Sequence, residues 1–367
     1  MTGVGHHDLV VLTFRDPLRG RDLRPGHLPS DLLWGALYAA DVRLQGTPLP
    51  TDNPYRVSSA FPFVGGEWLL PKPRASAHQG TGDRGSEPSD KKAVKRLEFV
   101  NLSDFVTLSS GQRLSPERLQ AAAARQRRAL LPVSAETLPL TVTPEHLARS
   151  LRGTKHAGRS AQWAGEQYAA QEKDLTPTER LHLSREARGR SVTGQAERQR
   201  NTQDRITQST TTFLTAQVMP PRLAFLLETS DEGQRTRLIA ALRLLTDSGL
   251  GGMRTQGSGQ FAFELQPLST ELKQRLGQGG PQVLLGLARP SADEAEQIDQ
   301  AEQASYTLVR RDGFLDGTPL QRQDVWLLAE GSLVPAPLNG TLADVSPPGH
   351  PHPVWRSGLA VSLGVGG

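Results

Sequence analysis

Five glycines fall within eleven consecutive positions of the run SGLGGMRTQGSGQFAF, residues 248–263. Glycine at this density leaves backbone N–H groups accessible to an anion, and Arg254 adds a guanidinium in the middle of the run. The run lacks the third glycine of the dinucleotide-binding fingerprint, and Ser258 stands where a P-loop has its lysine. We therefore expect a loop that binds the phosphates of a polymer rather than a nucleotide, with a flexible hairpin loop as the alternative.

Other polar side chains extend this candidate phosphate site. Arg200 and Arg205 can give charge-assisted, often bidentate contacts to phosphate oxygens. Lys72 lies between two prolines, which hold it on a stiff extended segment. Asn201 is suited to a base edge or a ribose 2′-hydroxyl, although a helix end or turn is an equal alternative for Arg200 and Asn201. The predicted RNA-binding residues are Lys72, Arg200, Asn201, Arg205, Gly251, Gly252, Arg254, Gly257, Ser258 and Gly259.

Aromatic and histidine side chains offer further chemistry. Trp34, Trp68 or Phe213 can stack on an unpaired base, with a place in a core or interface as the favoured alternative for each. His350 and His352 lie in a proline-rich turn without a nearby cysteine or paired carboxylate. We therefore expect no metal site and no cofactor.

Composition and charge narrow the class of protein. The chain has 367 residues, no cysteine and a formal net charge of +4, as expected of a cytoplasmic globular protein without disulfides. Residues 149–205 hold twelve Lys or Arg against seven Asp or Glu, which suits a phosphate-bearing partner. Residues 291–345 hold ten acidic side chains against three arginines and suit solvent or a basic protein partner. No apolar run is long enough to span a membrane.

The sequence predicts that helices and strands of an α+β protein position these residues. Ser30 is expected as the N-cap of the first helix, whose Leu33 and Leu37 share a buried stripe, while Trp34 and Tyr38 lie on a second face. The predicted elements are strands at 8–14, 205–219, 223–228 and 260–265, helices at 31–40, 116–130 and 234–245, and a hairpin-like unit at 61–73. The order strand, helix, strand, strand, helix, strand is that of a ferredoxin-like (RRM-like) domain.

Two such domains account for the chain. Residues 1–270 form the first ferredoxin-like domain, with a long basic insertion at about 74–205 whose residues 74–92 we expect to be disordered. Residues 271–367 form a second, smaller ferredoxin-like domain. Its predicted strands are 283–288, 306–311, 324–328 and 359–363, and its helix is 292–304.

The order of several motifs resembles a known family. The motifs are PSDLLWGAL, FPFVGGEWLLPKP, RNTQDRITQST, GLGGMRTQGSGQF, LLAEGSLV and HPVWRSGLAVSL. Together they resemble the RAMP-superfamily subunit that caps the type III-A (Csm) CRISPR effector complex at the 5′ end of its guide RNA. The resemblance implies two ferredoxin-like domains, binding of the 5′ tag of the crRNA, and docking onto the large polymerase-like subunit and the neighbouring backbone RAMP subunit. It implies a subunit that is not the nuclease.

Two alternatives of other classes remain open. His27 precedes the first helix, where related RAMP endoribonucleases carry a general base, so the chain can be a metal-independent enzyme that cleaves CRISPR precursors. A purely structural scaffold subunit is the other alternative, in which the acidic tail holds a partner and the basic segment is a solvated linker.

Overall fold

The computed structural model describes residues 5–20, 23–24, 26–47, 54–74, 97–130, 195–203, 210–218, 220–315, 318 and 320–365. Its helices are α1 (Ser30–Gln45), α3 (Leu102–Ser109), α4 (Pro116–Ala129), α8 (Glu232–Ser248), α9 (Thr270–Leu276) and α10 (Ala292–Gln300), with a 3-10 turn, η3 (Arg254–Gln256). Its longer strands are β1 (His6–Phe14), β4 (Phe61–Val64), β8 (Gln195–Gln203), β9 (Thr210–Val218), β10 (Leu223–Thr229), β11 (Phe261–Gln266), β13 (Leu308–Arg311), β14 (Val325–Leu328), β16 (Gly340–Asp344) and β17 (Trp355–Leu359). Its short strands are β2 (Leu18–Arg19), β3 (Arg56–Val57), β5 (Glu67–Trp68), β6 (Leu70–Pro71), β7 (Phe99–Val100), β12 (Gln282–Leu284), β15 (Leu333–Val334) and β18 (Ser362–Gly364).

A central antiparallel sheet has the strand order β11-β1-β10-β4-β5, and β3 also pairs with β10. β1 lies between β10 and β11, with Val10 opposite both Phe225 and Leu265. Five of the six predicted elements are present as β1, α1, β10, α8 and β11. The prediction that 205–219 supplies the remaining strand of this sheet is wrong, because β9 pairs with β2 and β8 instead and β4 lies beside β10. The mixed helix-and-sheet class is therefore confirmed.

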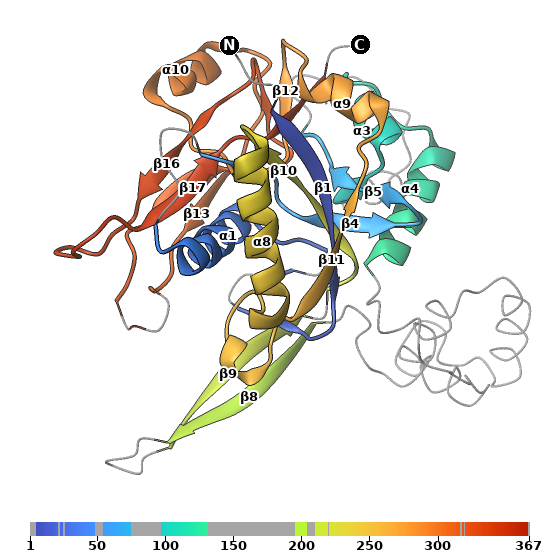
Figure 1. Ribbon diagram of the computed structural model, residues 1–367. Coiled ribbons are helices and arrows are strands. Elements are labelled where there is room, and N and C mark those ends of the chain that lie inside the picture. Colours follow the sequence, from blue (N-terminus) through green and yellow to red (C-terminus); the bar gives the residue numbers. More distant parts are fainter. Residues whose placement is uncertain are drawn as a thin grey trace, which may run out of the picture.

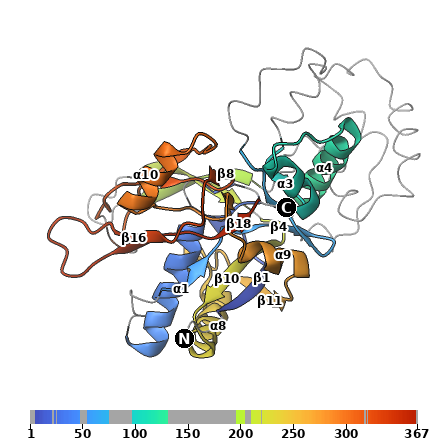
Figure 2. The ribbon, with the colours of Figure 1, turned by 90° about the horizontal axis from the view of Figure 1, so that it is seen from above.

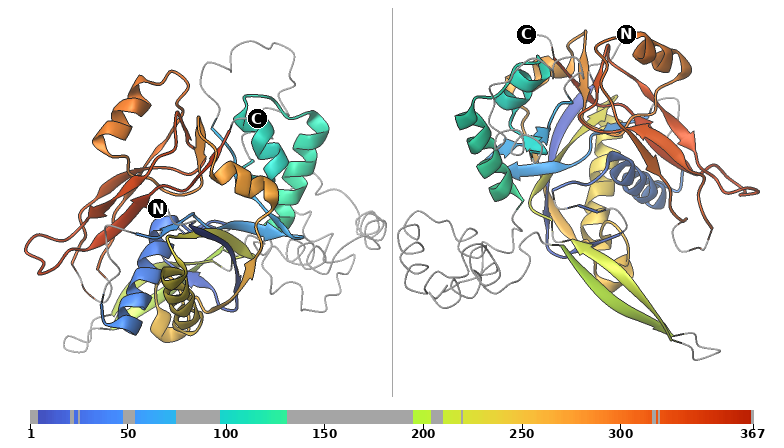
Figure 3. Two further views of the ribbon diagram at one scale, coloured as in Figure 1. Left: turned by 45° about the horizontal axis from the view of Figure 1, so that its top comes forward. Right: turned by 180° about the vertical axis from the view of Figure 1, so that it is seen from behind.

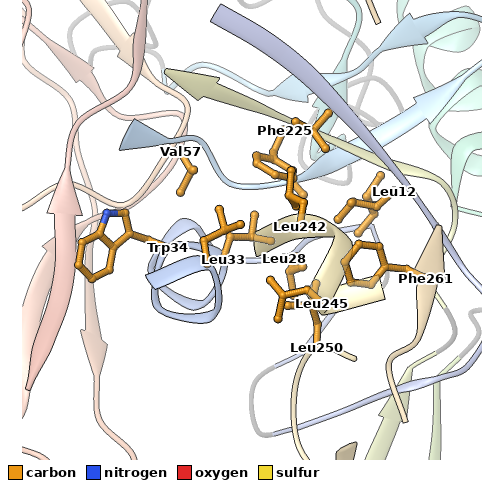
Figure 4. Close-up of a cluster of buried hydrophobic side chains, with 14 of the residues drawn as sticks. Leu12, Leu28, Leu33, Trp34, Val57, Phe225, Leu242, Leu245, Leu250 and Phe261 are labelled. Atoms are coloured by element: carbon orange, nitrogen blue, oxygen red, sulfur yellow. The ribbon is translucent and has the colours of Figure 1, made fainter. Parts of the chain in front are cut away.

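One face of this sheet is covered by α1 and α8 (Figure 1). Alternate residues of a strand point to the same face, so Val10, Leu12 and Phe14 of β1 lie in this core. Figure 4 shows Leu12, Phe225 and Phe261 of the sheet meeting leucines of α8. Asp231 is the N-cap of α8, and its carboxylate accepts the N–H of Gln234 at 2.8 Å and so satisfies one of the free amides of the first turn.

The other face of the sheet forms a second core. Leu9 and Val11 of β1 point to this side and share it with α3, α4, α9, β12 and β18. Figure 2 shows α3 and α4 on one flank of the molecule, with α10 and β16 on the other. Because the same core includes Val283 and Leu363, the C-terminal strands pack directly on the first sheet.

The C-terminal strands form three small sheets, β15-β12-β18, β13-β14 and β16-β17. The predicted helix at 292–304 is present as α10, and each predicted strand contains or overlaps a strand of the structure. α10 packs through Ile298 on a small core that includes Leu284, Leu328 and Val334. Figure 3 shows these strands beside the first sheet.

Two further predictions about the elements are wrong. Ser30 is not the N-cap of α1, because Pro29 holds that position and Ser30 is the first helical residue. Its hydroxyl accepts the N–H of Leu287 at 2.9 Å instead, which joins α1 to the C-terminal part. The proposed basic insertion also contains β8, which pairs along its whole length with β9 in a hairpin that projects from the body (Figure 1). The predicted disorder of 74–92 lies outside the described residues, apart from Arg74.

Candidate nucleic-acid interface

The glycine-rich loop connects α8 to β11 and closes on the segment that contains β2. Gly251 has a φ of 81°, and a Cβ atom there would lie 2.7 Å from the carbonyl oxygen of Arg19. Gly259 has a φ of 75°, and a Cβ atom there would overlap the carbonyl of Leu250. Only glycine accepts both the positive φ and the close backbone approach, so the glycines shape a compact, packed loop.

The backbone amides of this loop are largely engaged within the protein. Gly252 N–H donates to the carbonyl of Arg19 at 2.6 Å, Gly259 N–H to Pro17 at 3.1 Å, and Gly257 N–H to Arg254 at 2.9 Å. The expectation that these three glycines present free N–H groups to a phosphate is therefore wrong. Ser258 is also buried, with 4% of its surface exposed. The glycines of this loop therefore serve close packing against the protein's own backbone rather than the binding of an anion.

Polar side chains nevertheless gather on the outer side of the loop. The Arg19 guanidinium lies 3.4 Å from Oε1 of Gln256 and 3.5 Å from Sδ of Met253. Arg254 is half-buried in η3, and Thr255 beside it is exposed. Two guanidinium groups, Arg19 and Arg254, therefore belong to one loop and the strand it covers.

The loop lies at the base of the projecting hairpin. Arg19 of β2 is opposite Gln217 of β9, which in turn is opposite Ala196 of β8. Farther along β8, Arg200 and Asn201 are opposite Phe213 and Thr212. The structure therefore connects the glycine loop to the strand that carries Arg200 and Asn201, as a single interface would require. Arg205 lies outside the described residues.

Lys72 belongs to a different part of the surface. Its N–H donates to the carbonyl of Glu98 at 2.8 Å, and the N–H of Arg74 donates to Gly331 at 2.8 Å. Burial lowers the pKa of Lys72, the positive charge of Arg74 lowers it further, and Glu98 partly offsets both effects. Lys72 and Arg74 thus form a cationic segment beside the C-terminal part. This segment follows β6 in the chain and is not part of the glycine loop.

His27 takes part in a polar cluster that sequence reasoning missed. Its Nε2 lies 2.9 Å from Oε1 of Glu330, and the Ser59 hydroxyl donates to the same oxygen at 2.5 Å. Burial alone would raise the pKa of Glu330, but His27 and the hydrogen bonds from His27 and Ser59 lower it to about 2. His27 and Glu330 are 303 positions apart, so no local pattern indicates this contact.

Two of the aromatic candidates for base stacking are core residues. Trp34 is 2% exposed, and its ring stacks on Tyr55 with centroids 5.4 Å apart. Figure 4 shows Trp34 pointing from α1 toward the C-terminal strands. Trp68 is buried and its indole N–H donates to the carbonyl of Ala224 at 2.9 Å. The favoured prediction for Trp34 and Trp68, a place in the core, is therefore confirmed, and neither ring is accessible for stacking on a base.

No site for a metal emerges from the described part of the chain. Within it, no three His, Asp or Glu side chains converge as metal ligands would. His350 and His352 contact each other edge to face, with ring centroids 4.5 Å apart; His350 is half-buried and His352 is exposed. None of the described helices has the length and apolar content needed to cross a bilayer.

Comparison with known proteins bears on the identity of the C-terminal part. Residues 278–365 match the CRISPR Csm4 C-terminal domain. The predicted resemblance to a type III CRISPR subunit is confirmed. The matched region contains β12 to β18, α10 and Glu330, and therefore the carboxylate of the His27 cluster.

Curated relatives and a solved structure agree with this result. The "CRISPR system Cms protein Csm4" of Streptococcus thermophilus is 30% identical over 111 residues, 29% of this chain and 37% of that protein. The Mycobacterium tuberculosis (strain CDC 1551 / Oshkosh) protein of the same name is 32% identical over 131 residues, 34% of this chain and 40% of that protein. The matches thus span less than half of either relative. A chain of a Csm3-Csm4 subcomplex from a type III-A CRISPR-Cas interference complex shares the fold, with a TM-score of 0.53 and 16% identity over 97% of this chain and 98% of that one.

Proposed function

We propose that this chain is the non-catalytic RNA-binding subunit of a type III-A CRISPR effector complex, and that it holds the 5′ tag of the crRNA. The observation that carries the proposal is the Csm4 C-terminal domain at 278–365, packed on a sheet whose glycine loop adjoins a projecting hairpin. In this role the chain docks onto the large polymerase-like subunit and the backbone RAMP subunit, and it works in the cytoplasm. A protein of the same fold in a Csm3-Csm4 subcomplex supports a partner of the Csm3 kind.

The fold supports the proposal through its central sheet. The order β11-β1-β10-β4 with α1 and α8 on one face corresponds to strands four, one, three and two of a ferredoxin-like domain. We assign residues 1–270 to that domain and 271–367 to a second one, whose strands are divided among small sheets. Proteins built this way bind single-stranded RNA along a sheet or between domains.

We assign the phosphate contacts to the base of the hairpin. Arg19 contacts Gln256 of η3, the turn that also contains Arg254, and β8 carries Arg200 and Asn201 away from the loop along the hairpin. A guanidinium binds a phosphate through two parallel hydrogen bonds, which fixes the backbone of the RNA without reading its sequence. The glycines contribute indirectly, because their packing fixes the position of η3 and so of Arg254.

Cleavage by His27 is the competing function. A general base must reach the proton of an attacking 2′-hydroxyl, and His27 is 21% exposed with one ring nitrogen against Glu330. The contact with Glu330 and Ser59 also fits a structural role, in which His27 joins the N-terminal and C-terminal parts. We favour the structural role.

The test uses the purified full chain and a 5′-labelled crRNA, without metal, followed on a denaturing gel and by filter binding. The proposal predicts retention of intact RNA, and Arg254→Ala weakens retention while His27→Ala leaves it within twofold. His27→Ala is the matched control because it removes the candidate general base of the competing, enzymatic function. RNA cleavage that His27→Ala abolishes would establish the enzyme, and no retention at all would establish the scaffold.

A further inference from the structure

Exposed apolar side chains are concentrated in one short segment of the C-terminal part. Among the described residues seven large apolar side chains are exposed, and five of them lie between positions 306 and 326. These five, here called the apolar patch, are Tyr306, Leu308, Phe314, Leu320 and Trp326. Single exposed apolar residues are normal on a protein surface, whereas a concentration of this kind marks a contact surface.

The strand geometry shows which way the patch faces. Arg311 of β13 binds Asp31 in the first turn of α1, so that face of the β13-β14 hairpin is turned inward. Neighbouring residues of a strand point to opposite faces, so Leu308 and Arg310 point outward. Trp326 is directly opposite Arg310 and shares the outward face, where it is 58% exposed.

Part of this outward face is already covered within the chain. Leu328, opposite Leu308, is buried in the small core where Ile298 of α10 also lies. α10 therefore covers the end of the face at Leu328 and leaves Leu308 and Trp326 uncovered. The uncovered remainder continues an existing packing surface, and a partner seated on it would meet α10.

The charge next to the patch defines the chemistry of that partner. On α10 the side chains of Asp293, Glu296 and Asp299 are exposed, and no basic residue lies in the helix. Arg310, the cation on the patch, forms an ion pair with Asp324. A phosphate backbone seated here would be repelled by the helix, so RNA is disfavoured and a surface with lysine or arginine is favoured.

We propose that the apolar patch is a docking site for another protein subunit, one whose surface offers apolar side chains flanked by lysine or arginine toward α10. Trp326 supplies the central anchor. Its indole is exposed in the free chain and would be buried at the centre of the interface, where tryptophan side chains contribute most to the binding energy. The proposal rests on the proposed function only for the identity of the subunit, and it leaves the RNA at the base of the β8-β9 hairpin.

The experiment measures the affinity of the full chain for three probes: the large subunit, the backbone subunit and labelled crRNA. The variant Leu308→Ser with Trp326→Ser changes the patch, and Phe314→Ser tests it through a loop residue outside the strands. The matched control is Leu44→Ser, because Leu44 is 45% exposed in the last turn of α1, about 20 Å along the helix from Asp31.

We expect the double variant to bind one of the two subunits at least tenfold more weakly, Phe314→Ser to weaken the same subunit, and Leu44→Ser to stay within twofold. Affinity for crRNA should be unchanged. Wild-type affinity of the double variant for both subunits would overturn the proposal, as would failure of the unmodified chain to bind either. Loss of crRNA binding would assign the patch to RNA, and loss of a homodimer would assign it to a second copy. If only the proposed function fails, the unmodified chain does not bind crRNA, but the double variant still binds one subunit at least tenfold more weakly than the unmodified chain does.

Discussion

Asp31 joins the two parts of the chain through a buried ionic contact, and its removal is the sharpest perturbation the fold offers. Arg311 donates two hydrogen bonds to the Asp31 carboxylate, at 3.0 and 3.1 Å, and Arg356 donates one at 2.8 Å. The side chains of Asp31 and Arg356 are only 3% and 5% exposed. The two arginines come from β13 and β17, so a single carboxylate in α1 anchors both strands.

Asp31→Asn should destabilise the protein strongly. Three charge-assisted hydrogen bonds at about 1.5–3 kcal/mol each set an upper limit. The same substitution removes the counter-charge of two guanidinium groups, one of them in a buried position. Removing one partner of a buried ion pair costs about 3–5 kcal/mol, and we expect the loss in unfolding free energy to fall in that range.

The assay is urea unfolding of the full chain, with Asp324→Asn as the matched control. Asp324 pairs with Arg310 in the same hairpin, but those side chains are 34% and 54% exposed. An exposed pair contributes under about 1 kcal/mol, so the control should hardly shift the midpoint. If Asp31→Asn falls within about 1 kcal/mol of the unmodified chain, or if the two variants lose equal stability, the anchoring role of Asp31 is refuted.

Four other perturbations have defined outcomes. Arg254→Ala should weaken crRNA binding and flatten its salt dependence by ~0.7 in log–log slope, and an unchanged slope would remove Arg254 from the interface. Gly251→Ala should cost more than about 1–2 kcal/mol of unfolding free energy, because a Cβ there meets the Arg19 carbonyl, whereas Gly257→Ala, with the same kind of φ but open space, should cost only that amount. Burial raises the pKa of Glu228 to about 7 despite Arg56, so the folded state holds this proton more tightly than the unfolded chain and stability falls as pH rises. Relative to Glu228→Gln, the unmodified chain should lose about 2 kcal/mol between pH 5 and pH 8 in urea unfolding, and parallel curves would contradict this. Reversing Asp293 and Glu296 to lysine should slow assembly with the large subunit more at low salt than at high salt, and equal rates at low salt would make α10 a merely solvated face.

The choice of residues on α10 shows where the structure changes a sequence-based prediction. From charge alone Asp293, Glu294, Glu296 and Glu302 are equivalent acids on a helix. In the structure Glu294 forms a capping box with Ser291 and accepts the N–H of Asn339 at 2.6 Å, while Glu302 lies past the end of the helix. Glu294→Lys would therefore damage the fold, and the exposed Asp293 and Glu296 are the proper probes.

Local patterns predicted most of the elements because their signals are local. The apolar run of β1, the periodic leucines of α8 and the glycines before β11 each fall where the sequence indicates. β8 was missed because QAERQRNTQ has no apolar alternation, and a hairpin that projects from the body does not need one. Sequence reasoning therefore assigned no strand to this stretch and left it inside the basic insertion.

The candidate site was harder to predict because its partners are distant in the sequence. The N–H groups of Gly252 and Gly259 donate to backbone carbonyls in the segment before residue 20. The Ser30 hydroxyl accepts the N–H of Leu287. Density of glycine indicates close backbone approach, but it does not distinguish approach to a ligand from approach to the protein's own chain. For Trp34 and Trp68 the favoured prediction, a place in the core, agrees with their burial.

The central claim is that this chain recognises the 5′ tag of a crRNA, and it is tested most directly by comparing two labelled RNAs that differ only in that tag. Dissociation constants for the full chain are measured at one ionic strength, because affinities for nucleic acid depend on salt. The account predicts at least tenfold tighter binding of the tagged RNA, and it predicts that Arg254→Ala removes most of this difference while His27→Ala keeps it. Equal affinity for the tagged and untagged RNA would contradict the account.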